Sequence, residues 1–78
     1  MRHGAWRGKL RNKRQIRKDY RDAGFIERQG KGDHTVFSYP GLPKHYAVDG
    51  SDGADARPYD ERNLRAALQA QAETHGEA

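Results

Sequence analysis

One histidine of this chain lies where a proton-transfer residue would be useful, at the start of an expected strand. Gly, Lys, Gly and Asp occupy residues 30–33 and lead to His34, and residues 34–39 alternate in polarity as a strand does. An imidazole titrates near neutral pH, so His34 can take the proton of a ribose 2′-hydroxyl. The 2′-oxygen then attacks the adjacent phosphorus without a metal ion, while cationic groups stabilise the added negative charge. Lys31 and Arg28 lie close enough in the sequence to act as those cations.

The histidines also have plainer explanations. An isolated histidine is more often a surface residue than a catalyst, and His34 would then only cap the turn. His34, His45 and Asp49 could together bind a metal, but they lie apart across the expected hairpin, and we predict no metal site. The sequence has no nucleophile motif, Walker loop or dinucleotide fingerprint, and we predict no cofactor.

A β-hairpin is expected to position His34. Its strands are residues 34–39 and 44–49, and the four residues between them carry a proline at each end. A turn of this length sets three pairs on one apolar face: Tyr39–Lys44, Phe37–Tyr46 and Thr35–Val48. The same register places Asp49 opposite His34 on the other face, where its carboxylate would orient the imidazole.

A basic helix is expected before the first strand. Residues 13–23 have a narrow apolar stripe, with Asn12 as the cap, Gln15 at the third helical position and Gly24 as the stop. A short strand follows over residues 25–29. The other faces of the helix carry four basic side chains that we expect to bind RNA phosphates: Arg14, Arg17, Lys18 and Arg21. Solubility alone is the plainer explanation of these charges.

The rest of the chain completes a single domain. Residues 50–56 are rich in Gly, Ser and Asp and are expected to be flexible, and the second helix is expected to begin with Asp60 as its cap. The buried stripe of that helix is predicted to be Leu64, Ala67, Leu68 and Gln71. We predict a domain over residues 12–72, between a basic arm at 1–11 and a disordered tail at 73–78. The order of elements predicts an α+β two-layer sandwich, α-β-β-β-α, with both helices on one face of a three-stranded antiparallel sheet.

Charge is distributed unevenly along the 78 residues. Residues 1–31 hold 11 Lys and Arg against 3 Asp and Glu, a net charge of +8, whereas residues 32–78 hold 4 against 8, a net charge of −4. A basic half attracts phosphate backbones, and the acidic half could tune that attraction or contact a protein. The chain has no cysteine, no signal-peptide core and no apolar run of the length a membrane span needs, so we expect a soluble cytoplasmic protein.

From about residue 12 to residue 71 the chain resembles the HicA family of small bacterial mRNA-cleaving toxins. The matching features are the basic first helix ending in Ala23-Gly24-Phe25, the pair Arg28-Gln29, the triplet Gly32-Asp33-His34, the aromatic Phe37 and then Pro40. Three features depart from the family pattern, and one of them is the basic arm before Asn12, which is longer than is typical of the family. Asp33 replaces the common serine and brings a negative charge beside the histidine, and the usual Pro-Gly-Thr lead-in to the last helix is missing.

The resemblance implies a function as well as a fold. It implies a fold similar to a double-stranded-RNA-binding domain, and a ribosome-independent mRNA endonuclease that serves as the toxin of a type II toxin–antitoxin pair. His34 matches the histidine that the family needs for cleavage. The implied partners are mRNA and a HicB-like antitoxin that covers the active site, with a monomer when free and a hetero-oligomer in the complex. One alternative is a non-catalytic RNA- or protein-binding module on the same fold, because a fold does not decide function. Another is a toxin that has lost its activity, with Asp33 as the residue responsible.

Overall fold

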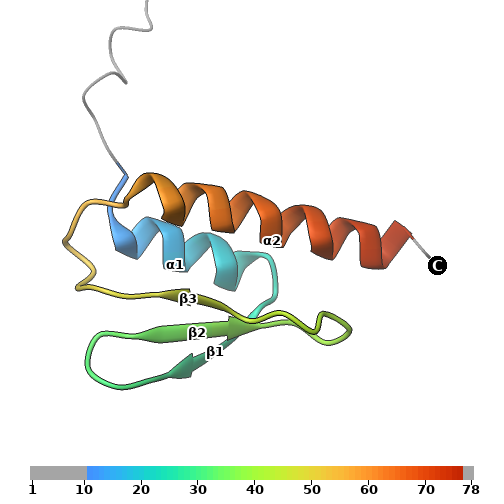
Figure 1. Ribbon diagram of the computed structural model, residues 1–78, viewed down its shortest axis with the longest axis horizontal. Coiled ribbons are helices and arrows are strands. Elements are labelled where there is room, and N and C mark those ends of the chain that lie inside the picture. Colours follow the sequence, from blue (N-terminus) through green and yellow to red (C-terminus); the bar gives the residue numbers. More distant parts are fainter. Residues whose placement is uncertain (1–10, 77–78) are drawn as a thin grey trace, which may run out of the picture.

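The computed structural model describes residues 11–76, which form an α+β domain with two helices on one face of a three-stranded antiparallel sheet (Figure 1). Its elements are α1 (Lys13–Asp22), β1 (Ile26–Gln29), β2 (Thr35–Ser38), β3 (Tyr46–Val48) and α2 (Pro58–Gly76). The predicted order and fold class are confirmed. The basic arm expected at residues 1–11 falls, apart from Arg11, outside the described residues.

Both ends of α1 follow the local sequence signals. The side chain of Asn12 accepts a hydrogen bond from the Gln15 amide at 3.0 Å, and the Gln15 side chain accepts one from the Asn12 amide at 3.0 Å, which completes a capping box. At the other end Gly24 has a φ of 95°, and the Phe25 amide donates to the Tyr20 carbonyl at 3.0 Å. This Schellman stop ends the helix at Asp22, one residue before the predicted end.

The hairpin register is the predicted one. Thr35 pairs with Val48 and Phe37 with Tyr46, and all four side chains are buried against the helices. The strands are shorter than predicted, so His34 and Asp49 lie just beyond the paired residues. The strand order is β1-β2-β3. Both helices lie on one face of this sheet, and no other element of residues 11–76 covers the opposite face (Figure 1).

Aromatic rings form the centre of the core. The ring of Tyr20 stacks on Phe37 with 4.5 Å between centroids, and Phe25 meets Tyr20 edge-on at 5.4 Å. Ile16 from α1 and Leu64 from α2 complete the contact between the two layers. Within the predicted stripe of α2, Leu64 and Ala67 are buried, whereas Leu68 is exposed.

The second helix differs from prediction at both ends. It begins at Pro58, two residues before the predicted cap, because proline suits the first helical position. Asp60 instead lies in the first turn, and its Oδ2 accepts from the Arg57 amide at 2.8 Å. The helix continues to Gly76, so residues 73–76 of the expected disordered tail are helical. The Tyr39 hydroxyl and His75 Nε2 are hydrogen-bonded at 2.7 Å, which fastens this last turn to the sheet layer.

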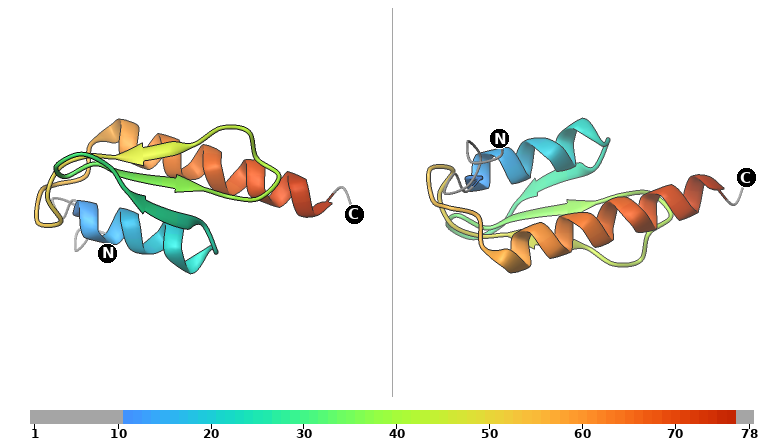
Figure 2. Two further views of the ribbon diagram at one scale, coloured as in Figure 1. Left: turned by 90° about the horizontal axis from the view of Figure 1, so that it is seen from below. Right: turned by 90° about the horizontal axis from the view of Figure 1, so that it is seen from above.

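The loop over residues 49–57 is tied to α1, although its composition predicted flexibility. The amide of Lys13 donates to the Ala54 carbonyl at 2.8 Å, and the amide of Arg14 donates to the Asp52 carbonyl at 3.1 Å. The first amides of a helix have no partner within the helix, and this loop supplies their acceptors. Both helices begin at the end of the sheet where this loop and loop 30–34 lie (Figures 1 and 2). Neither helix of residues 11–76 is long and apolar enough to cross a membrane.

Candidate active site

His34 closes the turn between β1 and β2 with its backbone and leaves its side chain exposed. Its amide donates to the Lys31 carbonyl at 3.0 Å, and its carbonyl accepts from the Gly30 amide at 2.8 Å. Gly32 supplies the left-handed conformation that the turn requires, with a φ of 58°. The backbone of the predicted proton-transfer residue is therefore fixed, while its imidazole is accessible to a ligand.

The backbone at Gly30 approaches His34 closely. A Cβ atom placed there would lie 3.2 Å from the Cβ of His34 and 3.4 Å from its carbonyl oxygen. The first distance is tighter than most contacts of a Cβ atom, so a side chain at position 30 would require His34 to shift by a few tenths of an ångström.

Arg17 lies under this turn and differs from its predicted role. We expected it to bind RNA phosphates from the helix surface, but it is only 5% exposed. Its Nε donates to the Thr35 hydroxyl at 3.0 Å, and its Nη2 donates to the Asp33 carbonyl at 2.8 Å. The guanidinium therefore bonds to the residues immediately before and after His34.

The same guanidinium also holds loop 49–57. Its Nη2 donates to the carbonyls of Gly50 at 2.6 Å and Val48 at 3.2 Å, and its Nη1 is 2.7 Å from the carboxylate of Asp52. With its donors directed at these acceptors inside the domain, Arg17 is not available as a phosphate ligand.

Asp49 was predicted to orient the imidazole of His34. The observed register puts the two residues at the next position after the Thr35–Val48 pair. The carboxylate of Asp49, however, has its Oδ1 3.6 Å from Nζ of Lys13. Among the described residues, no hydrogen bond or ion pair joins His34 to Asp49.

Lys13 forms a second buried charged cluster, which sequence reasoning missed. Its Nζ lies 3.2 Å from the carboxylate of Asp60, and the two side chains are 6% and 1% exposed. Lys13 and Arg17 are four residues apart, so they occupy one face of α1, the face that packs under loop 49–57. That spacing is the signal available in the sequence, but polarity alone places both basic side chains on the surface.

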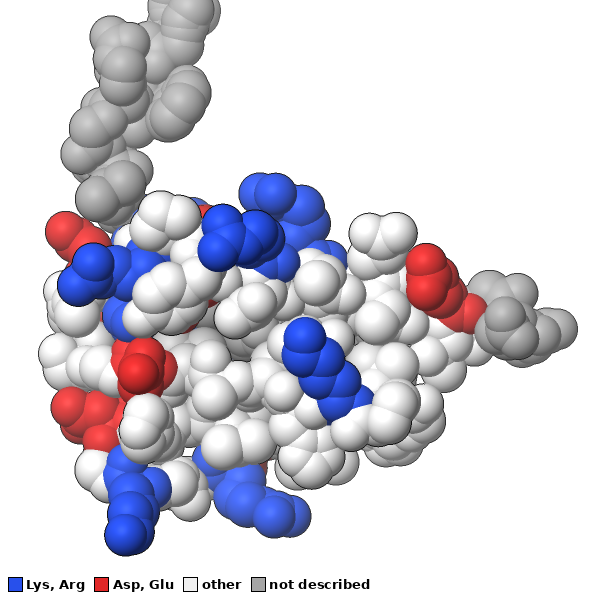
Figure 3. All heavy atoms as spheres, viewed as in Figure 1, with Lys and Arg blue, Asp and Glu red and all other residues white. Residues whose placement is uncertain are grey.

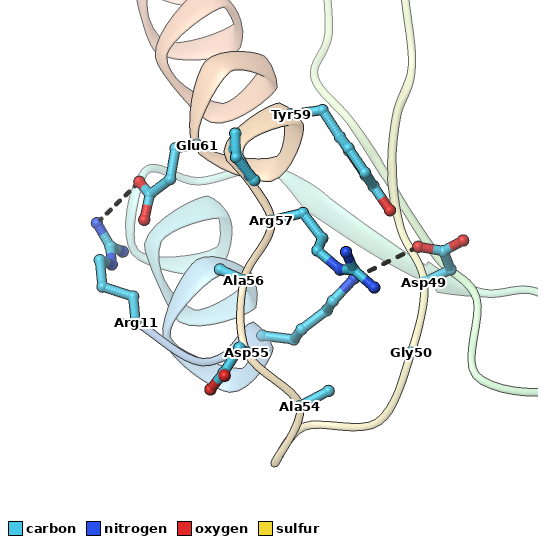
Figure 4. Close-up of a pocket in the computed structure, with 11 residues that line it drawn as sticks. Arg11, Asp49, Gly50, Ala54, Asp55, Ala56, Arg57, Tyr59 and Glu61 are labelled. Atoms are coloured by element: carbon cyan, nitrogen blue, oxygen red, sulfur yellow. Dashed lines mark ion pairs between the residues drawn. The ribbon is translucent and has the colours of Figure 1, made fainter. Parts of the chain in front are cut away.

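An open groove lies beside Lys13, between loop 49–57 and the first turn of α2 (Figure 4). The charged residues that line it are Arg11, Lys13, Asp49, Asp55, Arg57 and Glu61. Equal numbers of basic and acidic side chains leave the groove without a net charge to attract phosphate. His34 does not line it. We therefore place the candidate active site at the exposed turn and not in this groove.

The other predicted phosphate ligands are exposed, and two of them have acidic partners. Lys18 Nζ is 2.7 Å from Asp22, whose hydrogen bond and charge raise the pKa of this lysine. Arg21 is 3.2 Å from Glu27. Within residues 11–76 no ion pair joins a carboxylate to the exposed side chain of Arg14.

Arg28 and Lys31 lie near the turn that carries His34. Arg28 is opposite Val36 in the ladder, so its side chain extends from the uncovered face of the sheet, and Lys31 lies in the turn itself. Both side chains are exposed. On the face shown in Figure 3, basic side chains occupy several separate places, and most acidic ones lie near the end at which α2 begins.

No three His, Cys, Asp or Glu side chains within the described part of the chain come close enough to hold a metal ion. Comparison with protein-family models, curated proteins and solved structures found no match to this chain.

Proposed function

We propose that this protein is a HicA-type endoribonuclease, the toxin of a type II toxin–antitoxin pair, which cleaves mRNA without a ribosome or a metal ion. The observation that carries the proposal is the exposed imidazole of His34 on a turn whose backbone is fixed at both ends. The α-β-β-β-α order agrees with the fold that the sequence resemblance implies.

In the proposed reaction His34 accepts the proton of a ribose 2′-hydroxyl. A bond forms between the 2′-oxygen and the adjacent phosphorus, and the bond from phosphorus to the 5′-oxygen breaks. The leaving oxygen takes a proton from water, so the products are a 2′,3′-cyclic phosphate and a 5′-hydroxyl. Lys31 and Arg28 stabilise the negative charge that develops on the phosphoryl oxygens.

Binding of RNA is assigned to exposed cations only. Arg14, Lys18 and Arg21 contact phosphates along α1, and RNA competes with Asp22 and Glu27 for the last two. Exposed ion pairs are worth less than about 1 kcal/mol, so phosphate can displace these carboxylates. Arg17 is excluded from this set by its burial.

The proposed partner is a HicB-like antitoxin, and the proposed place of action is the cytoplasm, where mRNA is found. An exposed His34 is open to direct occlusion by such a partner. A complex in which His34 stays exposed would contradict inhibition by occlusion.

Expression of the wild type, His34→Ala and His45→Ala tests the proposal. His45 is an exposed histidine outside the proposed chemistry, and it therefore serves as the matched control. With folding confirmed by circular dichroism, growth arrest and cleavage of a purified mRNA in EDTA are compared. Loss of general acid–base catalysis lowers the cleavage rate by about 10²- to 10⁴-fold, so His34→Ala should lose both effects and His45→Ala should keep them.

The same experiment tests the alternative, a non-catalytic RNA- or protein-binding module. That alternative is favoured by the fact that His34 closes its turn with backbone atoms alone. It predicts that neither the wild type nor either variant cleaves the mRNA. A binding assay with the same RNA is then added, and equal binding by all three proteins would favour the RNA-binding form of this alternative.

A further inference from the structure

We propose that Arg17 is a positioning residue that fixes His34 for proton transfer, an inference that rests on the proposed function. The buried side chain of Arg17 forms hydrogen bonds both with the turn that carries His34 and with loop 49–57. Its partners in the turn are Asp33 and Thr35, the two chain neighbours of His34. Fixing the residues on both sides of a Cα atom restricts the direction in which the side chain between them leaves the backbone.

The chemistry of the guanidinium suits this task. Arginine presents five N–H donors in a rigid plane, so one side chain can hold several acceptors in fixed relative positions. The acceptors here are the Thr35 hydroxyl, three carbonyl oxygens and one carboxylate oxygen. A lysine ammonium at the same place is a compact point charge with three donors and cannot reproduce the plane.

Loop 49–57 supplies the second anchor of the guanidinium. Arg17 bonds to the Gly50 carbonyl at 2.6 Å and to the carboxylate of Asp52 at 2.7 Å. The loop itself is fixed to the first amides of α1 by backbone hydrogen bonds. The position of His34 is therefore set by α1 and loop 49–57 as well as by its own hairpin.

RNA does not contact Arg17 in this proposal, so the expected defect lies in the chemical step. Misplacement of a catalytic group by about 1 Å can cost about 100-fold in rate. Arg17→Lys should therefore lower kcat by about 100-fold and leave KM for RNA within about twofold. The control is Arg65→Lys, which changes an exposed arginine on α2 and should leave both constants unchanged.

A second variant pair isolates one hydrogen bond. Thr35→Val removes the acceptor of the Arg17 Nε and keeps the shape of the side chain, whereas Thr35→Ser keeps the acceptor. Thr35→Val should lower kcat by a smaller factor than Arg17→Lys does. Thr35→Ser should have a kcat close to that of the wild type. This pair also tests the proposal if Arg17→Lys fails to fold.

Hydrogen exchange of the His34 amide gives a readout that does not need activity. Exchange should be about tenfold faster in Arg17→Lys and Thr35→Val than in the wild type or Arg65→Lys, because hydrogen bonds that hold the turn closed are lost. A folded Arg17→Lys with wild-type kcat and wild-type exchange would overturn the positioning role. If the wild type cleaves no RNA, the proposed function fails. The exchange rates then decide the positioning role alone: faster exchange supports it and unchanged exchange overturns it.

Discussion

The Nζ atom of Lys13 lies 3.2 Å from the carboxylate of Asp60, and both side chains are almost completely buried. Lys13 begins α1 and Asp60 lies in the first turn of α2, so this ion pair joins the helices at the end that carries the candidate site. The Oδ2 atom of Asp60 also accepts from the Arg57 amide, whereas Oδ1 has no hydrogen-bond partner among the described residues. Within residues 11–76, Lys13 is therefore the one cation paired with this buried carboxylate.

Removal of the lysine charge should therefore destabilise the domain. Lys13→Met leaves the buried carboxylate of Asp60 unpaired, and we expect a loss of about 3–5 kcal/mol in the free energy of unfolding. The double variant Lys13→Met with Asp60→Asn should recover about 2 kcal/mol of that loss, because no unpaired charge remains. Urea denaturation measures both values, with Lys18→Met as the exposed control. Equal stabilities of Lys13→Met and Lys18→Met would contradict the role of the buried pair.

The buried phenol of Tyr20 should make the stability of the fold decrease at alkaline pH. Burial, followed by the nearby Tyr46 and Asp60, raises the pKa of the Tyr20 phenol. A folded state that holds the proton more tightly loses stability as the pH rises above the ordinary phenol pKa of about 10. Tyr20→Phe removes this group, so its stability should fall less steeply than that of the wild type in that range. Thermal unfolding at a series of pH values measures the difference, and identical slopes for the two proteins would rule out the effect.

Tyr20→Phe should also be at least as stable as the wild type at neutral pH. The buried hydroxyl of Tyr20 has no hydrogen-bond partner within residues 11–76. Leaving a polar group unsatisfied costs about 1–3 kcal/mol, and deleting it relieves that cost. A marked loss of stability in Tyr20→Phe at pH 7 would show that the hydroxyl has a partner in solution.

Substitution of Gly30 should disturb the candidate site more than the fold. In Gly30→Ala the new methyl group would meet the Cβ of His34 at 3.2 Å, so the histidine must shift by a few tenths of an ångström. We expect cleavage to fall about tenfold, with a loss of stability below about 1 kcal/mol. The control is Gly53→Ala, because Gly53 has open space around it and no positive φ. Full activity in Gly30→Ala would contradict a requirement for the observed histidine position.

The electrostatic role of Arg28 and Lys31 can be tested by salt dependence. Each phosphate contact to single-stranded RNA contributes about 0.7 to the slope of the logarithm of the binding constant against the logarithm of salt concentration. Arg28→Gln and Lys31→Gln should each reduce the slope by about 0.7, and Arg65→Gln should leave it unchanged. Fluorescence anisotropy with one labelled RNA at several salt concentrations gives the slopes. An unchanged slope in both variants would remove these residues from the RNA-binding surface.

The parts of the fold that could be predicted from sequence are those with short-range causes. A four-residue turn and the alternation of residues 34–39 were sufficient for the register that pairs Thr35 with Val48. Asn12 and Gly24 marked the ends of the first helix through their own backbone and side-chain chemistry. These signals depend on neighbours a few residues away, and they are visible in the chain itself.

The candidate site was only partly predictable. The position of His34 on an exposed turn follows from local signals, but the burial of Arg17 depends on loop 49–57, more than 30 residues away. Polarity alone places an arginine on the surface, and only the tertiary arrangement supplies the five acceptors that make its burial favourable. Asp49 lies in the same loop, and its carboxylate is paired with Lys13 of α1. The pairing of two strands could not reveal this contact.

Analysis of RNA end groups tests the role of His34 most directly. One purified RNA is incubated in EDTA with the wild type or with His34→Gln, and the new termini are identified by mass spectrometry. Attack by the 2′-oxygen predicts 2′,3′-cyclic phosphate and 5′-hydroxyl ends with the wild type and almost no fragments with His34→Gln. Equal fragment yields from the two proteins, or fragments ending in 3′-hydroxyl and 5′-phosphate, would contradict histidine-assisted attack by the ribose.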